Sequence, residues 1–291
     1  MVEFIVIGAM KSGTTSFSEL LSKVHLFQMY EQKEAQFFSM NYDDNHSVYD
    51  GLFENDNRIQ CEASTCYSRY PMYKDVPKRI HNYNSEMKFI YLLRDPVSRA
   101  YSHYCHNIIN DKINYTSFRH AIDTSDEVIN SSKYMYQINQ YLKYFKPEQI
   151  LLLDFDELKK SPEAVLEKVF QFLGLDTNSL VLDKHNNKVH NKKGTAAAKR
   201  DITSVILRLR NLPFLSGIIN FLIPKHKREH LRKDMVDYIS NSFISKVLVS
   251  RKKDKVNELN EQDTQYVYEK IKDDICELEK FWGQNLSKWH R

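Results

Sequence analysis

The chain has 291 residues, of which 42% are apolar and 27% charged, and its formal net charge is +4. With a mean hydropathy of −0.57, it has the composition of an ordinary soluble protein with one large α/β domain or two small ones. The mild charge gives no reason to expect a nucleic-acid partner. Only 7 glycines and 7 prolines are present, which argues against a long disordered or collagen-like region.

Neither a targeting segment nor a membrane span is evident. The first residues read directly as a strand, without a basic segment followed by an apolar stretch and a cleavage site. No window of about 18 uncharged apolar residues occurs. The four cysteines form no C-x-x-C pair, so no structural zinc site is indicated and free thiols are expected. We therefore expect a cytoplasmic protein without a metal.

Apolar segments alternate with helix-like segments in the first part of the chain. Residues 2–8 are apolar at odd and even positions alike, which is typical of a strand buried on both faces. Similar runs predict further strands, and apolar spacings of three and four predict helices: strands at 88–93 and 149–154, helices at 14–24, 97–107, 162–173 and 264–282. Gly174 is expected to cap the 162–173 helix. The alternation predicts an α/β fold with a central parallel sheet, which binds ligands at the carboxyl ends of its strands.

The composition changes between residues 184 and 255. An apolar segment interrupted by Arg208, Arg210 and Pro213 precedes a basic cluster at 225–234. The 201–234 stretch could therefore contact a membrane surface or an anionic glycan. We favour a packed, basic helical insertion at about 198–255, because charged helix faces are usually only solvated. On this interpretation the whole chain, 1–291, is a single domain.

The first strand leads into the loop "GAMKSGTTS", which begins at Gly8. A glycine-bounded turn before a helix directs unpaired backbone N–H groups and the positive end of the helix dipole at one point, which favours an anion. A nucleoside-triphosphate loop has its lysine directly after the second glycine, whereas here Thr14 follows Gly13 and Lys11 lies within the turn. The lysine therefore suits a single 5′-phosphate. The alternative is an ordinary β–α turn whose glycines only permit tight packing.

The strand at 88–93 leads into a second unusual segment, "RDPVSRAYSHY". Arg94 leaves the end of a buried strand, where a charge is costly unless it is paired. Asp95 and Pro96 are typical of a helix start, and Ser102 follows about two turns later. An arginine fork with a hydroxyl can bind a second phosphate. Pairing of Arg94 with an acidic neighbour is an equally good interpretation of this segment alone.

Together, "KSGTTS" and "RDPVSRAYSHY" resemble the cofactor signature of sulfotransferases that use 3′-phosphoadenosine 5′-phosphosulfate, PAPS. The resemblance implies a P-loop-like three-layer fold, no metal, and release of 3′-phosphoadenosine 5′-phosphate, PAP. It assigns the 5′ side of the cofactor to residues of the first loop: Lys11, Ser12, Gly13, Thr14, Thr15 and Ser16. Arg94 and Ser102 would hold the 3′-phosphate.

The segment "KEAQFF" resembles the K-E-x-x-F-F element of the heparan-sulfate-type branch, here as a bacterial member. This resemblance makes Glu34 the catalytic base toward the acceptor, while Lys11 would stabilise the departing phosphate oxygen. Lys33 and Gln36 become candidate acceptor contacts. Several relatives have histidine where this chain has Gln36, so the acceptor cannot be transferred from them. The alternative is a solvated Lys33–Glu34 pair beside a hydrophobic anchor of phenylalanines.

Two weaker resemblances complete the predicted site. The segment "CEASTCYSRYP" matches the family pattern E-K-x-P-x-Y at Glu62 and Tyr67, but Ala63 replaces the lysine. We expect this segment to follow a strand end and to line the acceptor site; the alternative is a plain β–α connection. Lys193 and Gly194 resemble a late loop that closes over the cofactor, and a mobile basic loop is the alternative.

The function that these residues imply is transfer of the PAPS sulfuryl group to a carbohydrate hydroxyl or amine. The acceptor would be a carbohydrate, such as a polysaccharide or a lipid-linked sugar, with peripheral membrane contact through 201–234. Two alternatives remain open on the sequence. An atypical P-loop kinase would share the fold and the first loop but lacks a lysine after Gly13. A non-catalytic nucleotide- or glycan-binding protein would keep the site without the chemistry.

Overall fold

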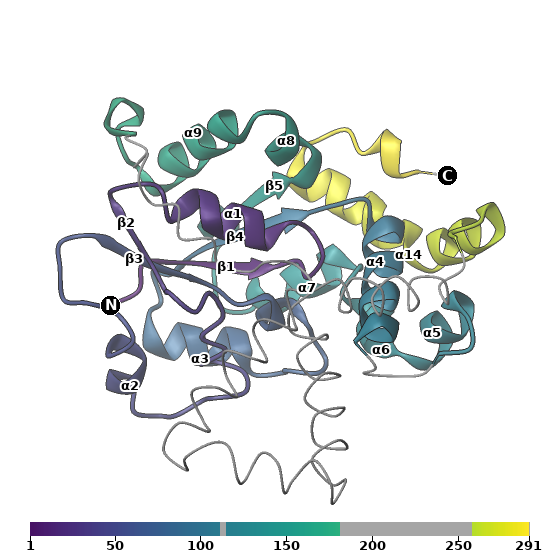
Figure 1. Cartoon of the computed structure of the whole chain (residues 1–291), viewed down its shortest axis with the longest axis horizontal. Helices are drawn as coiled ribbons and strands as arrows, with labels where there is room; N and C mark the ends of the chain where they lie inside the picture. The colour runs from purple at the N-terminus through teal and green to yellow at the C-terminus, as the bar shows by residue number, and fades with distance from the viewer. Residues whose placement is uncertain (111–114, 181–257, 291) are drawn as a thin grey trace, which may run out of the picture. The chain divides into compact units, whose positions relative to one another are not determined.

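The computed structural model describes residues 1–110, 115–180 and 258–290 (Figure 1). The larger of two compact units comprises Met1–Tyr104, Thr116–Lys188 and Leu259–Arg291. Residues 105–115 group with the second unit, most of which is not described. Lys193, Gly194 and the predicted insertion at 198–255, with its 201–234 stretch, lie outside the described residues. No described helix is both long and apolar enough to span a bilayer.

Five parallel strands form one sheet in the order β2-β3-β1-β4-β5 (Figure 1). The strands are β1 Phe4–Gly8, β2 Phe27–Met29, β3 Ile59–Ala63, β4 Lys88–Leu93 and β5 Ile150–Asp154. The central β1 is buried throughout, and β4 is buried beyond Lys88, as expected of strands covered on both faces. The three strands predicted from apolar runs are β1, β4 and β5.

Three helices cover one face of the sheet: α1 Thr14–Leu21, α8 Phe155–Lys160 and α9 Pro162–Leu173. Side chains of alternate strand positions, such as Val6 and Ile90, form a continuous core with Phe17 and Phe170. α9 has the predicted bounds and ends at Gly174 in the left-handed conformation, with φ of 78°. This core fixes α1 against the sheet and hence the position of the loop before it.

α3 Val76–Tyr83 and α7 Tyr134–Tyr141 lie on the opposite face, where aromatic side chains of α7 pack against β4 (Figure 1). The rings of Phe89 and Tyr141 are 4.9 Å apart, and those of Tyr91 and Tyr134 are 5.8 Å apart. Within the described ranges, the other helical elements are α2 Ser47–Asp50, η1 Thr65–Ser68, α4 Pro96–Ile109, α5 Phe118–Thr124, α6 Asp126–Asn130, η2 Pro147–Gln149, η3 Thr177–Ser179, α14 Glu261–Trp282 and η5 Ser287–Trp289. The predicted three-layer α/β fold with a central parallel sheet is therefore confirmed.

α14 holds α7 in place through one carboxylate. Asp274 accepts hydrogen bonds from the backbone N–H groups of Met135, at 3.0 Å, and Tyr136, at 2.8 Å, in the first turn of α7. A helix N-terminus leaves such N–H groups unpaired, so a distant carboxylate here acts as a cap. Burial raises the pKa of Asp274 to about 6, although both hydrogen bonds lower it.

Asp274 is expected to make stability depend on pH between about 4 and 7. Its pKa is higher in the folded chain than in the unfolded one, so its contribution is full below the unfolded value and falls as pH rises through about 6. Asp274→Asn removes this titration and leaves one N–H group without an acceptor. The stability advantage of the wild type over the variant should shrink by about 2.4 kcal/mol from pH 4 to pH 7, because pH 4 already lies just above the unfolded pKa and each pKa unit is worth about 1.4 kcal/mol.

Urea unfolding of both proteins at each pH measures this difference, and titrations common to both cancel. A wild-type advantage that stays constant across the range would contradict a raised pKa at Asp274.

Candidate active site

Most of the predicted site residues in the described part of the chain belong to segments at the carboxyl edge of the sheet. β3, β1 and β4 are neighbours and run parallel, so the segments that follow them emerge at the same edge. The segment after β2 joins them, because Ala63 at the end of β3 donates its N–H to the Lys33 carbonyl at 3.3 Å. The phosphate loop, the "KEAQFF" segment and the β3 end therefore share one region, with Arg94 at the end of β4.

The first loop presents an uncapped helix N-terminus. Gly13 is the N-cap of α1 with φ of 85°, no side chain caps the helix, and its first turn contains no acidic residue. A Cβ atom on Gly13 would lie 2.5 Å from the Phe155 ring, so only glycine fits. Ser12 and Thr14 are buried, and Thr15 and Ser16 are more exposed. This geometry has the unpaired donors and the dipole direction of an anion site.

Glu34 lies beside this helix terminus. Its Oε1 accepts hydrogen bonds from Thr65 Oγ1 at 3.0 Å and Lys33 Nζ at 3.3 Å, and its Oε2 accepts one from Gln36 Nε2 at 3.1 Å. The Lys33 ammonium also reaches the hydroxyl of Thr15, at 3.2 Å. The predicted base is thus partly exposed but held in one orientation, next to the hydroxyls of the predicted phosphate site.

Glu62 and Tyr67 are both buried, which argues against their prediction as acceptor contacts. Glu62 lies within β3 rather than after it and is fully buried. Its carboxyl group accepts from the Tyr49 and Tyr67 hydroxyls at 2.7 and 2.9 Å, from Ser64 Oγ at 2.6 Å and from the Ala35 N–H at 3.2 Å. Burial raises the pKa of Glu62. The pair instead supports the segment that carries Glu34.

The two phenylalanines of "KEAQFF" anchor that segment. Phe37 stacks on Tyr49 with ring centres 4.9 Å apart, and Phe38 packs edge-on against the same ring at 4.8 Å. Both phenylalanines are buried, and Phe38 N–H donates to the Tyr67 hydroxyl at 3.1 Å. The two phenylalanines therefore form the expected hydrophobic anchor, and Glu34, the predicted base, is left partly exposed beside it.

Arg94 links the second segment to the first loop. Its Nη1 donates to the Lys11 carbonyl at 3.2 Å, and its guanidinium lies 5.3 Å from the centre of the Phe155 ring. Tyr134 OH donates to the Arg94 carbonyl at 2.7 Å, which fixes the backbone at this point. The predicted helix start is confirmed, with Asp95 Oδ1 accepting the Ser98 N–H at 2.7 Å. Ser102 is partly exposed on the second turn of α4.

Sequence reasoning missed Arg99, the second arginine of "RDPVSRAY". It is fully buried and donates from Nε to Ser132 Oγ at 2.6 Å and from Nη1 to the Met10 carbonyl at 3.4 Å. Burial lowers the pKa of Arg99 to about 10. Arg99, which belongs to α4 and is buried, therefore connects α4 to the first loop through the Met10 carbonyl. An arginine one turn after a helix start, on the apolar face, was the available signal.

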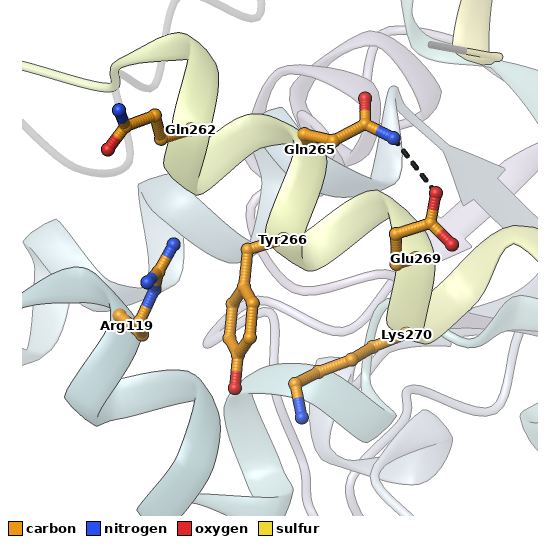
Figure 2. A pocket seen from close by; sticks show the side chains of 6 residues that line it. All are labelled: Arg119, Gln262, Gln265, Tyr266, Glu269 and Lys270. Carbon is orange, nitrogen blue, oxygen red and sulfur yellow. Dashed lines mark hydrogen bonds between the residues drawn. The ribbon is translucent and has the colours of Figure 1, made fainter.

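A hollow of about 540 Å³ lies elsewhere, between α5 and α14 (Figure 2). Tyr266 stands between Arg119 and Lys270, whose cationic groups lie 4.4 and 4.8 Å from its ring centre. Asp263 lies 3.7 Å from Arg119, and Asp123 lies 3.4 Å from Lys270. These acids offset the positive charges, and none of the lining residues belongs to the predicted site. Within the described ranges, no group of His, Cys, Asp or Glu is arranged to hold a metal ion.

The sequence is similar to those of several curated proteins. Mouse heparan sulfate glucosamine 3-O-sulfotransferase 6 is 28% identical over 190 residues, covering 62% of this chain and 54% of the relative. Human heparan sulfate glucosamine 3-O-sulfotransferase 3B1 is 29% identical over 191 residues, covering 62% of this chain and 47% of the relative. The chain thus spans about half the length of the curated relatives it matches.

A solved structure and a family model complete the comparison. The crystal structure of a sulfotransferase from Alicyclobacillus acidocaldarius matches with a TM-score of 0.65 and 21% identity, covering 100% of this chain and 99% of the other. This likeness establishes a shared fold. Residues 2–217 match the model of the sulfotransferase domain. The chain therefore belongs to the sulfotransferase family.

Proposed function

We propose that the protein is a PAPS-dependent sulfotransferase that acts on a hydroxyl or amine of a carbohydrate. One observation carries the proposal: a single ammonium group, Lys33 Nζ, lies 3.3 Å from the Glu34 carboxylate and 3.2 Å from the Thr15 hydroxyl. A candidate base and a candidate phosphate site are thus separated by only two hydrogen bonds. In-line transfer requires this proximity, because the acceptor lies between base and donor.

The residues present fit the donor. The uncapped N-terminus of α1, with Lys11, Thr14 and Thr15, suits a 5′-phosphate. Arg94 lies next to the Lys11 carbonyl and has further guanidinium N–H groups for a 3′-phosphate. When bound, PAPS supplies an activated sulfuryl group on its 5′-phosphate. The Phe155 ring packs against Gly13 where a Cβ atom would stand, so this contact helps to fix the conformation of the loop.

The protein's own groups divide the chemistry. Glu34 accepts the acceptor proton at a carboxylate oxygen, and Thr65 and Gln36 hold that carboxylate in orientation. Lys11 and the N–H groups of the first α1 turn stabilise negative charge on the departing phosphate oxygen. Gln36 is adjacent to the base and partly exposed, so it remains a candidate acceptor contact.

A carbohydrate acceptor is supported by the similarity to heparan sulfate glucosamine 3-O-sulfotransferases and by the "KEAQFF" segment that positions Glu34. Gln36 differs from the histidine of several relatives, so the sugar and the choice of oxygen or nitrogen are left to experiment. A screen with ³⁵S-labelled PAPS against N-acetylheparosan, N-sulfoheparosan and bacterial capsular glycans identifies the acceptor.

Calorimetry with PAP and with ATP plus magnesium tests the cofactor. We expect PAP to bind at least about tenfold more tightly, because two phosphate sites are engaged, each by charge-assisted hydrogen bonds. A preference for ATP would instead indicate a kinase. PAP binding without sulfate transfer to any glycan would indicate a binding protein.

A further inference from the structure

Lys33 has an unusual backbone conformation. In the described part of the chain, the non-glycine residues with positive φ are Lys11 at 73°, Lys33 at 69° and Gln36 at 54°. All three belong to the predicted site. Positive φ is costly for a residue with a Cβ atom and persists where surrounding contacts impose it, often at functional sites. For Lys33 these contacts are its N–H bond to the Tyr30 carbonyl, at 3.0 Å, and the bond from Ala63 N–H to its own carbonyl, at 3.3 Å.

The Lys33 side chain points toward the N-terminus of α1. Its Nζ donates to Thr15 Oγ1 at 3.2 Å and approaches Thr14 Oγ1 at 3.5 Å, and only 17% of the side chain is exposed. A cation is unfavourable at this end of a helix, where the dipole is already positive. Glu34 offsets one positive charge, but Lys11 adds another to the same turn. The arrangement is therefore best explained by an anion that binds among these groups.

We propose that Lys33 is a further catalytic residue, which donates hydrogen bonds to the sulfuryl group during transfer; this rests on the proposed function. The acceptor O–H proton passes to Glu34, an oxygen–sulfur bond forms, and the bond from sulfur to the 5′-phosphate oxygen breaks. The electron pair stays on that phosphate oxygen, and Lys33 keeps its protons. Because protonation of Glu34 removes its charge, the ammonium is released from the ion pair as negative charge builds up on the donor side.

The position of Ala63 fits this role. Ala63 replaces the lysine of the resembled E-K-x-P-x-Y pattern, and its N–H is bonded to the carbonyl of Lys33. The backbones of Lys33 and Ala63 are thus adjacent. Lys33 therefore places an ammonium group close to the position at which the family pattern has its lysine, although it comes from the "KEAQFF" segment. The competing explanation is that Lys33 only anchors the phosphate or only orients Glu34.

Kinetics of Lys33→Ala in the full chain separate these explanations. We expect kcat for PAPS consumption, with N-acetylheparosan and with water as acceptors, to fall by about 10²- to 10³-fold, as for loss of one transition-state donor. PAP affinity by calorimetry should change less than about threefold, because PAP lacks the sulfuryl group, and Lys33→Arg should restore part of the rate. The control is Lys78→Ala, which changes an exposed lysine of α3.

Equal losses in PAP affinity and kcat/KM would make Lys33 a phosphate anchor and overturn the proposal. A kcat within about threefold of wild type would also overturn it. If the wild type neither binds PAP nor consumes PAPS, the proposed function itself has failed, which is a different result.

A second measurement does not depend on turnover. In Glu34→Gln, Lys33 has no carboxylate partner at this position, so this variant should bind PAPS about tenfold more tightly than PAP, as one charge-assisted hydrogen bond predicts. Adding Lys33→Ala should abolish that preference in calorimetry. If the double variant keeps the preference, Lys33 does not contact the sulfuryl group.

Discussion

Glu34→Gln is expected to lower kcat for sulfuryl transfer by about 10³-fold while PAP affinity changes less than about threefold. Glutamine has the same shape, and its carbonyl oxygen can still accept the 3.0 Å hydrogen bond from Thr65 Oγ1. It cannot accept the proton of an acceptor hydroxyl. The variant therefore removes the chemical function of Glu34 and leaves the phosphate loop intact.

Steady-state rates with ³⁵S-labelled PAPS and calorimetry with PAP measure the two quantities. Glu86→Gln, at an exposed carboxylate between α3 and β4, is the matched control and should behave as wild type. An unchanged kcat in Glu34→Gln would remove Glu34 from the mechanism. A parallel loss of PAP binding would mean that the side chain supports the loop rather than the reaction.

The core of the fold could be predicted because its central strands are buried on both faces. β1, β4 and β5 appear in the sequence as apolar runs, whereas β2 has only three residues, Phe27–Met29. β3 was harder to assign because it contains Gln60 and Glu62. Glu62 can be buried there only because hydroxyls and an N–H group from distant residues satisfy its carboxyl group, and a local pattern does not contain this information.

In the site, too, the features that depend on neighbouring residues could be predicted, whereas contacts between residues far apart in sequence could not. The first loop is a contiguous motif, so its turn between a strand and a helix N-terminus could be predicted from "GAMKSGTTS" alone. The contacts that complete it join residues far apart in sequence, such as Lys33 with Thr15 and Arg99 with Met10. These contacts depend on the strand order, which composition and periodicity do not determine.

Lys33 and Glu62 illustrate the consequence. Both were predicted as acceptor contacts, Lys33 from the "KEAQFF" segment and Glu62 from the weaker resemblance of "CEASTCYSRYP". The structure buries Glu62 completely within β3 and directs Lys33 to the helix terminus that faces the proposed donor. Residue type alone does not distinguish a charge that supports the backbone from one that meets a ligand, but burial does.

Arg94→Ala is expected to weaken PAP binding by about 10- to 100-fold and to leave binding of adenosine 5′-monophosphate nearly unchanged. Adenosine 5′-monophosphate lacks the 3′-phosphate, so it reports on the first loop only. The difference between the two ligands isolates the contact that we assign to the Arg94 guanidinium. Calorimetry with both nucleotides on wild type and variant gives the four affinities.

The two-ligand design is needed because Arg94 has a second contact. Its Nη1 donates to the Lys11 carbonyl at 3.2 Å, so its removal could disturb the 5′-phosphate site directly. That effect would weaken both nucleotides equally, as Arg99→Ala should, since Arg99 holds the Met10 carbonyl of the same loop. Arg94→Lys keeps a charge but not the fork, and should recover only part of the preference for PAP. Equal losses for both nucleotides in Arg94→Ala would make Arg94 a loop support. The 3′-phosphate site would then lie elsewhere. Without a 3′-phosphate site, "GAMKSGTTS" indicates only that a phosphate binds and does not distinguish PAPS from other nucleotides.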